Sequence, residues 1–298
     1  MIFKEILEKN GDTVATAVSE LFEAAENSQN HPQDILLIIM HGYFSELLAK
    51  PEVYEKHKVS PYMLGLDLIG HAERTHYEFI DWYRKSHCVS LKEFEDKVKI
   101  DKELEKAERL SIHIEKDIYL RFWESNMILK QMLQLSTLAL GKPYDWHLNI
   151  PEYSREGSKQ EIIRNEIRDR LIDICPKFYS LIKGTYLTQI RNAIAHSQFY
   201  MGGRIIGYLN YSDDPQAYCP IRVLTYIEWA EYFHNTLLLH NALKRNLDKY
   251  QDKYYEETRK TGFIEVRITK DDNSILLERL GLKKQGKDWT WLKNIEDK

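Results

Sequence analysis

The stretch YLTQIRNAIAHSQFY, residues 186–200, indicates a helical fold for the part of the chain around it. Its apolar residues recur at intervals of three and four, which is typical of an amphipathic helix. Gly202 and Gly203 follow, and glycine readily takes the left-handed conformation that ends a helix. We therefore expect a helix over about residues 186–201 that these glycines stop.

The same periodicity extends along the chain on both sides of this stretch. It predicts further helices over residues 12–27, 33–49, 60–83, 91–141, 159–182 and 222–259. RIIGYLNY, residues 204–211, reads instead as a strand, and a polar turn follows it. The expected fold class is mainly α: a multi-helix bundle with a short β-hairpin insertion after the helix at 186–201.

The C-terminal segment changes character. FIEVRIT, residues 263–269, alternates like a strand, ILLERL at 275–280 predicts a short helix, and WTWL at 289–292 predicts a final hairpin arm. The chain is therefore expected to divide into an α-helical bundle, residues 1–260, and a small α/β tail, residues 261–298, packed on that bundle.

Composition supports long helices and limits the possible partners. The 298 residues include only 13 Gly and 8 Pro, which is a shortage of turn residues. The 43% hydrophobic content is that of a folded chain rather than a disordered one. The formal net charge of −4 excludes a broad basic surface, so contact with nucleic acid requires a local patch.

The cysteines and the apolar runs bear on the cellular environment. Cys88, Cys175 and Cys219 are far apart and form no C-x-x-C pair, which indicates a reducing compartment. The first residues lack the apolar core of a signal peptide. The longest apolar run, residues 35–40, is too short for a bilayer, which needs about 20 residues. We expect a soluble, cytoplasmic protein without membrane contact.

The sharpest motif is Ile-Arg-Asn-Ala-Ile-Ala-His, residues 190–196. Arg191 and His196 are separated by four residues, and Asn192 follows the arginine directly. This resembles the signature of the HEPN (higher eukaryotes and prokaryotes nucleotide-binding) superfamily, over about one helix of the chain. The resemblance implies a helical, homodimeric, metal-independent endoribonuclease of toxin–antitoxin or phage-defence systems. The implied partners are RNA, a second copy and an antitoxin or regulatory protein, and no cofactor is implied.

The motif residues suit RNA cleavage chemically. RNA carries its own nucleophile, the 2′-hydroxyl, and histidine is a base that titrates near neutral pH. His196 is therefore the candidate acid–base group. Arg191 is the candidate stabiliser of charge on the phosphate oxygens, and Asn192 would orient the phosphate or the imidazole. The expected products are a 2′,3′-cyclic phosphate and a 5′-hydroxyl.

Helix geometry separates the two catalytic candidates. Asn192 and His196 are four apart and share a face with Gln189, a candidate RNA contact. Arg191 is five before His196, which rotates it by about 140° on the helix. A second copy across a two-fold axis, or a distorted helix end, would bring the pair together. Some HEPN toxins carry a tyrosine two residues after the histidine, which a partner nucleotidyltransferase modifies, but this chain has Gln198 there.

A small basic cluster precedes the motif. Arg164 and Arg168 are four apart and are candidates to guide RNA phosphates toward Arg191. Acidic residues alternate with them, which also fits a solvated face of mixed charge.

Two non-catalytic interpretations compete with the catalytic one. The motif segment also fits an ordinary surface helix on which Arg191 forms a salt bridge. The remaining interpretation is a catalytically inactive, HEPN-like module that binds nucleotide or protein.

A di-iron bundle is the remote alternative. Glu73…His76 and Glu231…His234 have the Glu-x-x-His spacing of such sites, and Glu46 lies on an earlier predicted helix. Pairs of this kind also arise by chance. A hydrogen-bonded core histidine is the ordinary interpretation of His76, which falls on an apolar stripe.

Overall fold

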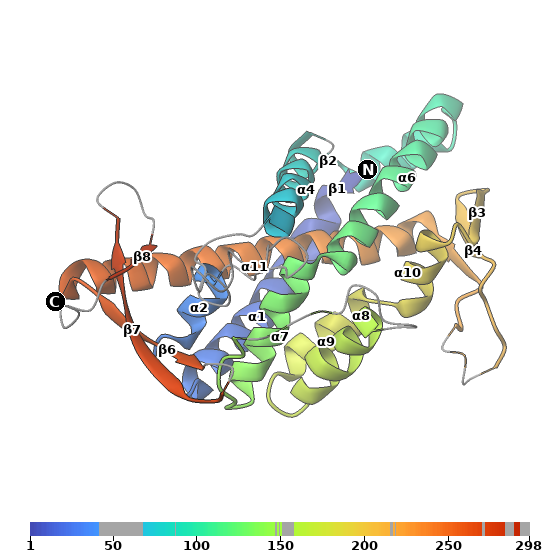
Figure 1. Ribbon diagram of the computed structural model, residues 1–298. Coiled ribbons are helices and arrows are strands. Elements are labelled where there is room, and N and C mark those ends of the chain that lie inside the picture. The colour runs from blue at the N-terminus through green and yellow to red at the C-terminus, as the bar shows by residue number, and fades with distance from the viewer. Residues whose placement is uncertain are drawn as a thin grey trace. The chain divides into compact units, whose positions relative to one another are not determined.

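The computed structural model is mainly α-helical, which confirms the expected fold class (Figure 1). It describes residues 1–41, 68–86, 88–146, 148, 150, 158–214, 217, 219–269, 272–283 and 289–292. The helices are α1 (Lys4–Ser28), α2 (Asp34–Met40), α4 (Leu68–Ser86), α5 (Leu91–Val98), α6 (Lys102–Glu124), α7 (Asn126–Ala139), α8 (Ser158–Glu161), α9 (Pro176–Thr185), α10 (Thr188–Ala195) and α11 (Tyr226–Thr261), with a π-helical turn at Ile162–Arg168 and a 3-10 turn at Asp169–Leu171. The strands are β1 (Ile2–Phe3), β2 (Cys88–Val89), β3 (Phe199–Gly202), β4 (Ile205–Tyr208), β5 (Val223–Thr225), β6 (Ile264–Thr269), β7 (Ile275–Leu282) and β8 (Trp289–Trp291).

The chain forms two compact units, and α1, α4, α7 and α11 each contribute residues to both. The first unit comprises Met1–Val18, Thr75–Ile128 and Pro176–Ala242. The second comprises Ser19–Arg74, Leu129–Cys175 and Leu243–Lys298. The boundary expected at residue 260 therefore falls inside the second unit, where the tail shares one compact body with much earlier parts of the chain.

Capping residues divide the helical stretch expected over 91–141 into three helices. Ser90 and Asp101 accept hydrogen bonds from backbone amides in the first turns of α5 and α6. Ser125 ends α6, and its hydroxyl accepts from the Ile128 amide at 3.1 Å at the start of α7. Each break therefore satisfies amides that a helix start would otherwise leave without a partner.

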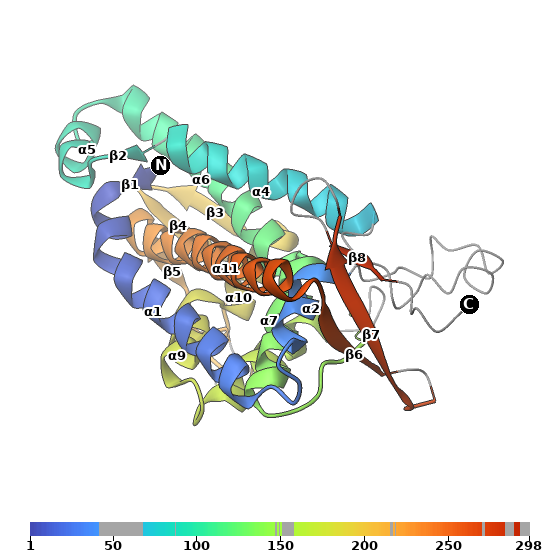
Figure 2. The same cartoon turned by 90° about the vertical axis from the view of Figure 1, so that its left-hand side faces the viewer.

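An apolar cluster joins the start of the chain to α5 in the first unit. The short parallel pair β1–β2 runs beside these elements (Figure 2). The rings of Phe3 and Phe94 lie 5.4 Å apart, centroid to centroid. The buried members of the cluster are Phe3, Ile6, Phe94, Val98 and Ala230.

The first unit also contains the antiparallel sheet β3–β4–β5, whose β3–β4 pair is the hairpin expected after the motif helix. Gly203 and Arg204 form its two-residue turn, with φ of 59° and 58°. Positive φ at both turn residues is typical of a type I′ hairpin. The expectation that Gly202 and Gly203 end the motif helix is therefore wrong. Gly202 is the last residue of β3, and Gly203 is the first residue of the hairpin turn.

The second unit contains the antiparallel sheet β6–β7–β8. The segment 275–280 belongs to β7, so the expected short helix there is wrong, and the described part of the tail is a β-sheet rather than α/β. β7 pairs with β6 from Leu280↔Ile264 to Ile275↔Thr269. Strand pairing and the burial of one face override the helix preference of Leu, Glu and Arg. The final arm is confirmed as β8.

The cysteines are free thiols, of which Cys88 is exposed and Cys175 is buried. Burial raises the pKa of the Cys175 thiol to about 12, so this thiol stays protonated and unreactive. Across the described residues, no helix combines the length and the apolar content that a bilayer crossing requires.

Candidate functional site

The motif helix α10 is anchored at its start by α6. The hydroxyl of Tyr119 donates to the carbonyl of Thr185 at 3.1 Å and accepts from the amide of Leu187 at 3.3 Å. Burial raises the pKa of Tyr119, which keeps this hydroxyl protonated. The link between α9 and α10 is therefore held on both sides, and the first turn of α10 has a defined position against α6.

Arg191, on α10, has polar partners on two helices. Its guanidinium pairs with Glu124, in the last turn of α6, and its Nη1 donates to Oδ1 of Asn192 at 2.9 Å. The side chain of Arg191 is 17% exposed and that of Glu124 is 30% exposed. These contacts use three of the five guanidinium N–H groups and leave two. Glu124 is a partner that no sequence spacing indicates, because it lies 67 residues from Arg191.

The motif helix is shorter than expected and ends just before His196. The amide of Ser197 donates to the carbonyl of Ile194 at 3.2 Å, and that of Gln198 donates to the carbonyl of Ala193 at 2.8 Å. Ser197 has φ of 55°, in the left-handed region. This is the Schellman arrangement, in which a left-handed residue satisfies the last carbonyls of a helix.

His196 is the C-cap residue of α10, and its side chain is exposed. Its amide donates to the carbonyl of Asn192 at 3.0 Å. Among the residues that the structure describes, the imidazole has no hydrogen-bond or ion-pair partner and no bond to Arg191. The structure thus holds Arg191 and Asn192 together and leaves His196 open to solvent beside them in the chain.

Gln189 has a structural role and is not available to contact RNA. Its side chain is buried, with Nε2 donating to the carbonyl of Ile221 at 2.6 Å and Oε1 accepting from the Ile221 amide at 2.9 Å. Its own carbonyl accepts from Nδ2 of Asn210 at 2.9 Å. Gln189 therefore fastens the segment before β5 onto α10, and both ends of its amide are occupied within the chain.

Arg164 and Arg168 lie in the π-helical turn and belong to the second unit, whereas Arg191 belongs to the first. Arg168 pairs with Asp169, at 2.6 Å and 3.0 Å. The neighbouring Arg170 is likewise paired with a carboxylate. Arg168 and Arg170 therefore lie on a surface of mixed charge, which was the alternative to an RNA-guiding cluster.

The Glu-x-x-His pairs do not assemble a metal site among the described residues. No group of three His, Cys, Asp or Glu side chains there is arranged to hold an ion. His76 accepts from Arg121 at 2.9 Å, and Glu231 accepts from Asn10 at 2.7 Å. Glu46, the expected carboxylate of a further helix, lies outside the described residues.

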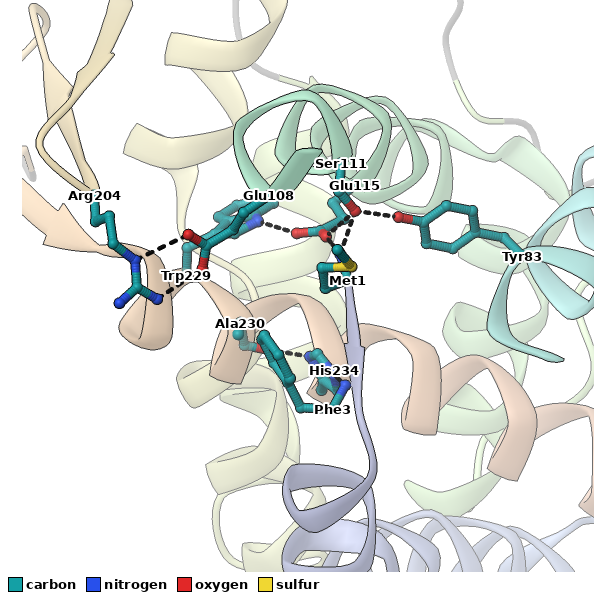
Figure 3. Close-up of polar contacts among 10 residues, drawn as sticks. All are labelled: Met1, Phe3, Tyr83, Glu108, Ser111, Glu115, Arg204, Trp229, Ala230 and His234. Carbon is teal, nitrogen blue, oxygen red and sulfur yellow. Dashed lines mark hydrogen bonds and ion pairs between the residues drawn. The ribbon is translucent and has the colours of Figure 1, made fainter. Parts of the chain in front are cut away.

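The first unit also contains a buried polar cluster around Glu115 (Figure 3). Glu115 accepts from Nε1 of Trp229 and from the hydroxyl of Ser111, both at 2.8 Å, and pairs with the amino group of Met1. The hydroxyl of Tyr83 completes the chain of bonds, 2.6 Å from that of Ser111. Because its buried carboxylate is both paired and hydrogen-bonded, the cluster stabilises the core.

Both ring nitrogens of His234 form hydrogen bonds with backbone groups in the same region (Figure 3). Its Nδ1 donates to the carbonyl of Ala230 and its Nε2 accepts from the amide of Phe3, both at 2.6 Å. Burial lowers the pKa of His234 to about 4, so the imidazole is neutral at neutral pH. His234 is thus a hydrogen-bonded core histidine, whereas His76, for which that role was expected, is only half-buried and accepts from Arg121 at an exposed position.

Comparisons of the chain with protein-family models, with curated proteins and with solved structures find no match.

Proposed function

We propose that the chain is a metal-independent endoribonuclease of HEPN type. The observation that carries the proposal is the end of α10, where an exposed imidazole, His196, follows a guanidinium, Arg191, that Glu124 and Asn192 hold in place. An acid–base group open to solvent and a positioned cation are the two functions that RNA cleavage requires.

In this reaction His196 takes the proton of the 2′-hydroxyl, and the 2′-oxygen attacks the phosphorus. The bond from phosphorus to the 5′-oxygen breaks, and the departing oxygen receives a proton. The products are a 2′,3′-cyclic phosphate and a 5′-hydroxyl, with no oxidant and no metal in the balance. Nucleophile and phosphate belong to one molecule, so positioning supplies much of the acceleration.

Arg191 stabilises the charge that develops on the phosphate oxygens through the two N–H groups its partners leave. Glu124 keeps the guanidinium in one orientation and reduces its net charge. Such a grip is local, which agrees with a chain whose formal net charge is −4.

A second copy completes the site in this proposal. Arg191 is 17% exposed on α10, and His196 lies beyond the end of that helix, without a bond between them. A two-fold axis beside α10 would place His196 of one copy near Arg191 of the other. The biological role would be that of a toxin or phage-defence effector with an antitoxin or regulatory partner, as the motif resemblance implies.

The test is RNA cleavage in EDTA by the wild-type chain and by the Arg191→Ala and His196→Ala variants. We expect the wild type to release 2′,3′-cyclic phosphate ends and His196→Ala to cut about 100- to 10,000-fold more slowly. Mass spectrometry of the fragments identifies the ends.

Matched controls are His113→Ala and Arg259→Ala, which remove an exposed histidine and an exposed arginine outside the motif. Both should cut like the wild type. Equal cutting by the motif variants and the wild type, or no cutting by any of them, would contradict the proposal.

A non-catalytic HEPN-like binding module is the second candidate. The ion pair between Arg191 and Glu124 favours it, because this pair gives Arg191 a structural task within one chain. Such a module would bind RNA or nucleotide without releasing cyclic phosphate ends, so the same assay separates the two candidates.

A further inference from the structure

The sheet β3–β4–β5 follows the motif helix directly and has two unlike faces. One face packs on α6, where Nζ of Lys116 lies 3.3 Å from the ring centroid of Phe199 and 3.3 Å from Sδ of Met201. Ile206 and Tyr208 of β4 are buried on this same face. Since side chains alternate along a strand, the residues between them point to the opposite face.

The opposite face is open and largely apolar. Tyr200 is 52% exposed, Leu209 is 66% exposed and Val223 is 39% exposed. Tyr200 and Val223 are the cross-strand partners of Gly207 on its two sides, so the three form one row across the sheet. Leu209 directly follows β4, and its amide donates to the carbonyl of Gln198 at 2.9 Å.

The ring of Tyr200 covers Gly207, its cross-strand partner on β4. A β-carbon added to Gly207 would stand 2.2 Å from Cζ of the Tyr200 ring, so the ring occupies the space that only glycine leaves. One side of the ring thus rests on β4, while more than half of the residue remains exposed to solvent. An aromatic ring fixed against a strand with an open side is a platform for stacking a planar group.

This platform is continuous with the candidate site. Only three residues separate Tyr200 from His196, so their α-carbons are at most about 14 Å apart. Gln198 lies between them in the sequence, just before β3, and is exposed. Its amide carries both donors and an acceptor, as the edges of nucleobases do.

We propose that Tyr200 stacks an unpaired base of the RNA strand whose backbone reaches His196. This inference rests on the proposed function, since the strand is the same substrate. Stacking on an aromatic ring tolerates any base and requires it to be unpaired, so the substrate class is single-stranded RNA. It also supplies affinity that a chain of net charge −4 cannot draw from a broad basic surface.

The test is the binding of a fluorescein-labelled, single-stranded 2′-O-methyl RNA 10-mer, which lacks the nucleophilic hydroxyl. Tyr200→Leu still covers Gly207 but has no aromatic face, and we expect it to bind at least tenfold more weakly. Tyr200→Phe keeps the ring and should bind within about twofold of the wild type. Equal binding by Tyr200→Leu and the wild type would overturn the inference, as would a preference for the same RNA in a duplex.

Gly207→Ala tests the geometry while Tyr200 stays in place in the sequence. The new β-carbon would collide with the end of the Tyr200 side chain, which can swing into solvent. We expect an unchanged unfolding midpoint but binding weakened about as much as in Tyr200→Leu. Unchanged binding of this variant would show that the ring position does not matter.

A cleavage assay on unmodified RNA separates this inference from the nuclease proposal. If the wild type cuts and Tyr200→Leu cuts with the same KM, the stacking inference fails and the nuclease proposal stands. If the wild type binds single strands through Tyr200 but cuts none, the nuclease proposal fails and the stacking site remains.

Discussion

The end of α10 and the first turns of α11 each contain a histidine from a short sequence motif, and the fold treats the two in opposite ways. His234 is buried, and both of its ring nitrogens bond to backbone groups at 2.6 Å. His196 is exposed at a helix cap, with only its backbone engaged by hydrogen bonds among the described residues. A motif states which residue types recur, whereas burial and partners decide whether an imidazole remains available.

The largest expected difference between the two regions is in stability. His234→Ala opens a cavity beside Phe3 and leaves the Phe3 amide without its acceptor, so we expect the free energy of unfolding to fall by about 3–5 kcal/mol. His196→Ala should change it by less than about 0.5 kcal/mol. Urea unfolding followed by circular dichroism measures both. Similar losses of unfolding free energy in the two variants would contradict the different structural roles of His234 and His196.

Acidification should act through His234. Its pKa is lowered from 6.5 to about 4 in the folded chain, so the unfolded chain binds the proton first. Stability from this group is present above pH 6.5 and is lost as the pH falls through 4, by about 3 kcal/mol in total.

The control for this pH effect is His234→Gln, which keeps a polar side chain but does not titrate. Subtracting its unfolding profile removes opposing groups such as Asp34, whose pKa burial raises to about 6. Asp34 works with the opposite sign, because folding disfavours its charged form and acidification through pH 6 relieves that cost. A difference profile that is flat between pH 7 and 4 would contradict the assignment to His234.

A smaller effect should appear at Arg191. Glu124→Gln keeps an acceptor for the guanidinium but removes the negative charge beside it, so we expect the non-cleavable RNA to bind about three- to tenfold more tightly. Glu103→Gln, which removes an exposed carboxylate at the other end of α6, is the matched control. Equal gains in both variants would indicate a general charge effect rather than one at Arg191.

The smallest expected effect is at the helix cap itself. Ser197 has φ of 55°, a conformation that costs a side chain more than it costs glycine. Ser197→Gly should therefore raise the free energy of unfolding by about 0.5 kcal/mol. Ser197→Ala retains the backbone strain and should not raise the free energy of unfolding. A loss of stability in Ser197→Gly would show that the serine side chain contributes a contact of its own.

The features predicted correctly depend on neighbours in the chain. Apolar periodicity indicated the helices, and the hairpin after the motif has a turn at Gly203-Arg204 that only nearby residues form. The errors have tertiary causes. Gln189 has the spacing of a surface contact, but Ile221 occupies its amide. Segment 275–280 has helix-forming residues but pairs with β6.

The sequence by itself determined the mainly α class and the motif of Arg191, Asn192 and His196, because helical periodicity and residue spacing are local properties. Only the tertiary structure decided that Glu124 holds Arg191 and that α10 ends just before His196. It alone laid Tyr200 across Gly207 on the open face of a sheet. Each of these depends on which distant segments bury each other's surfaces and satisfy each other's polar groups, and no local pattern encodes that pairing.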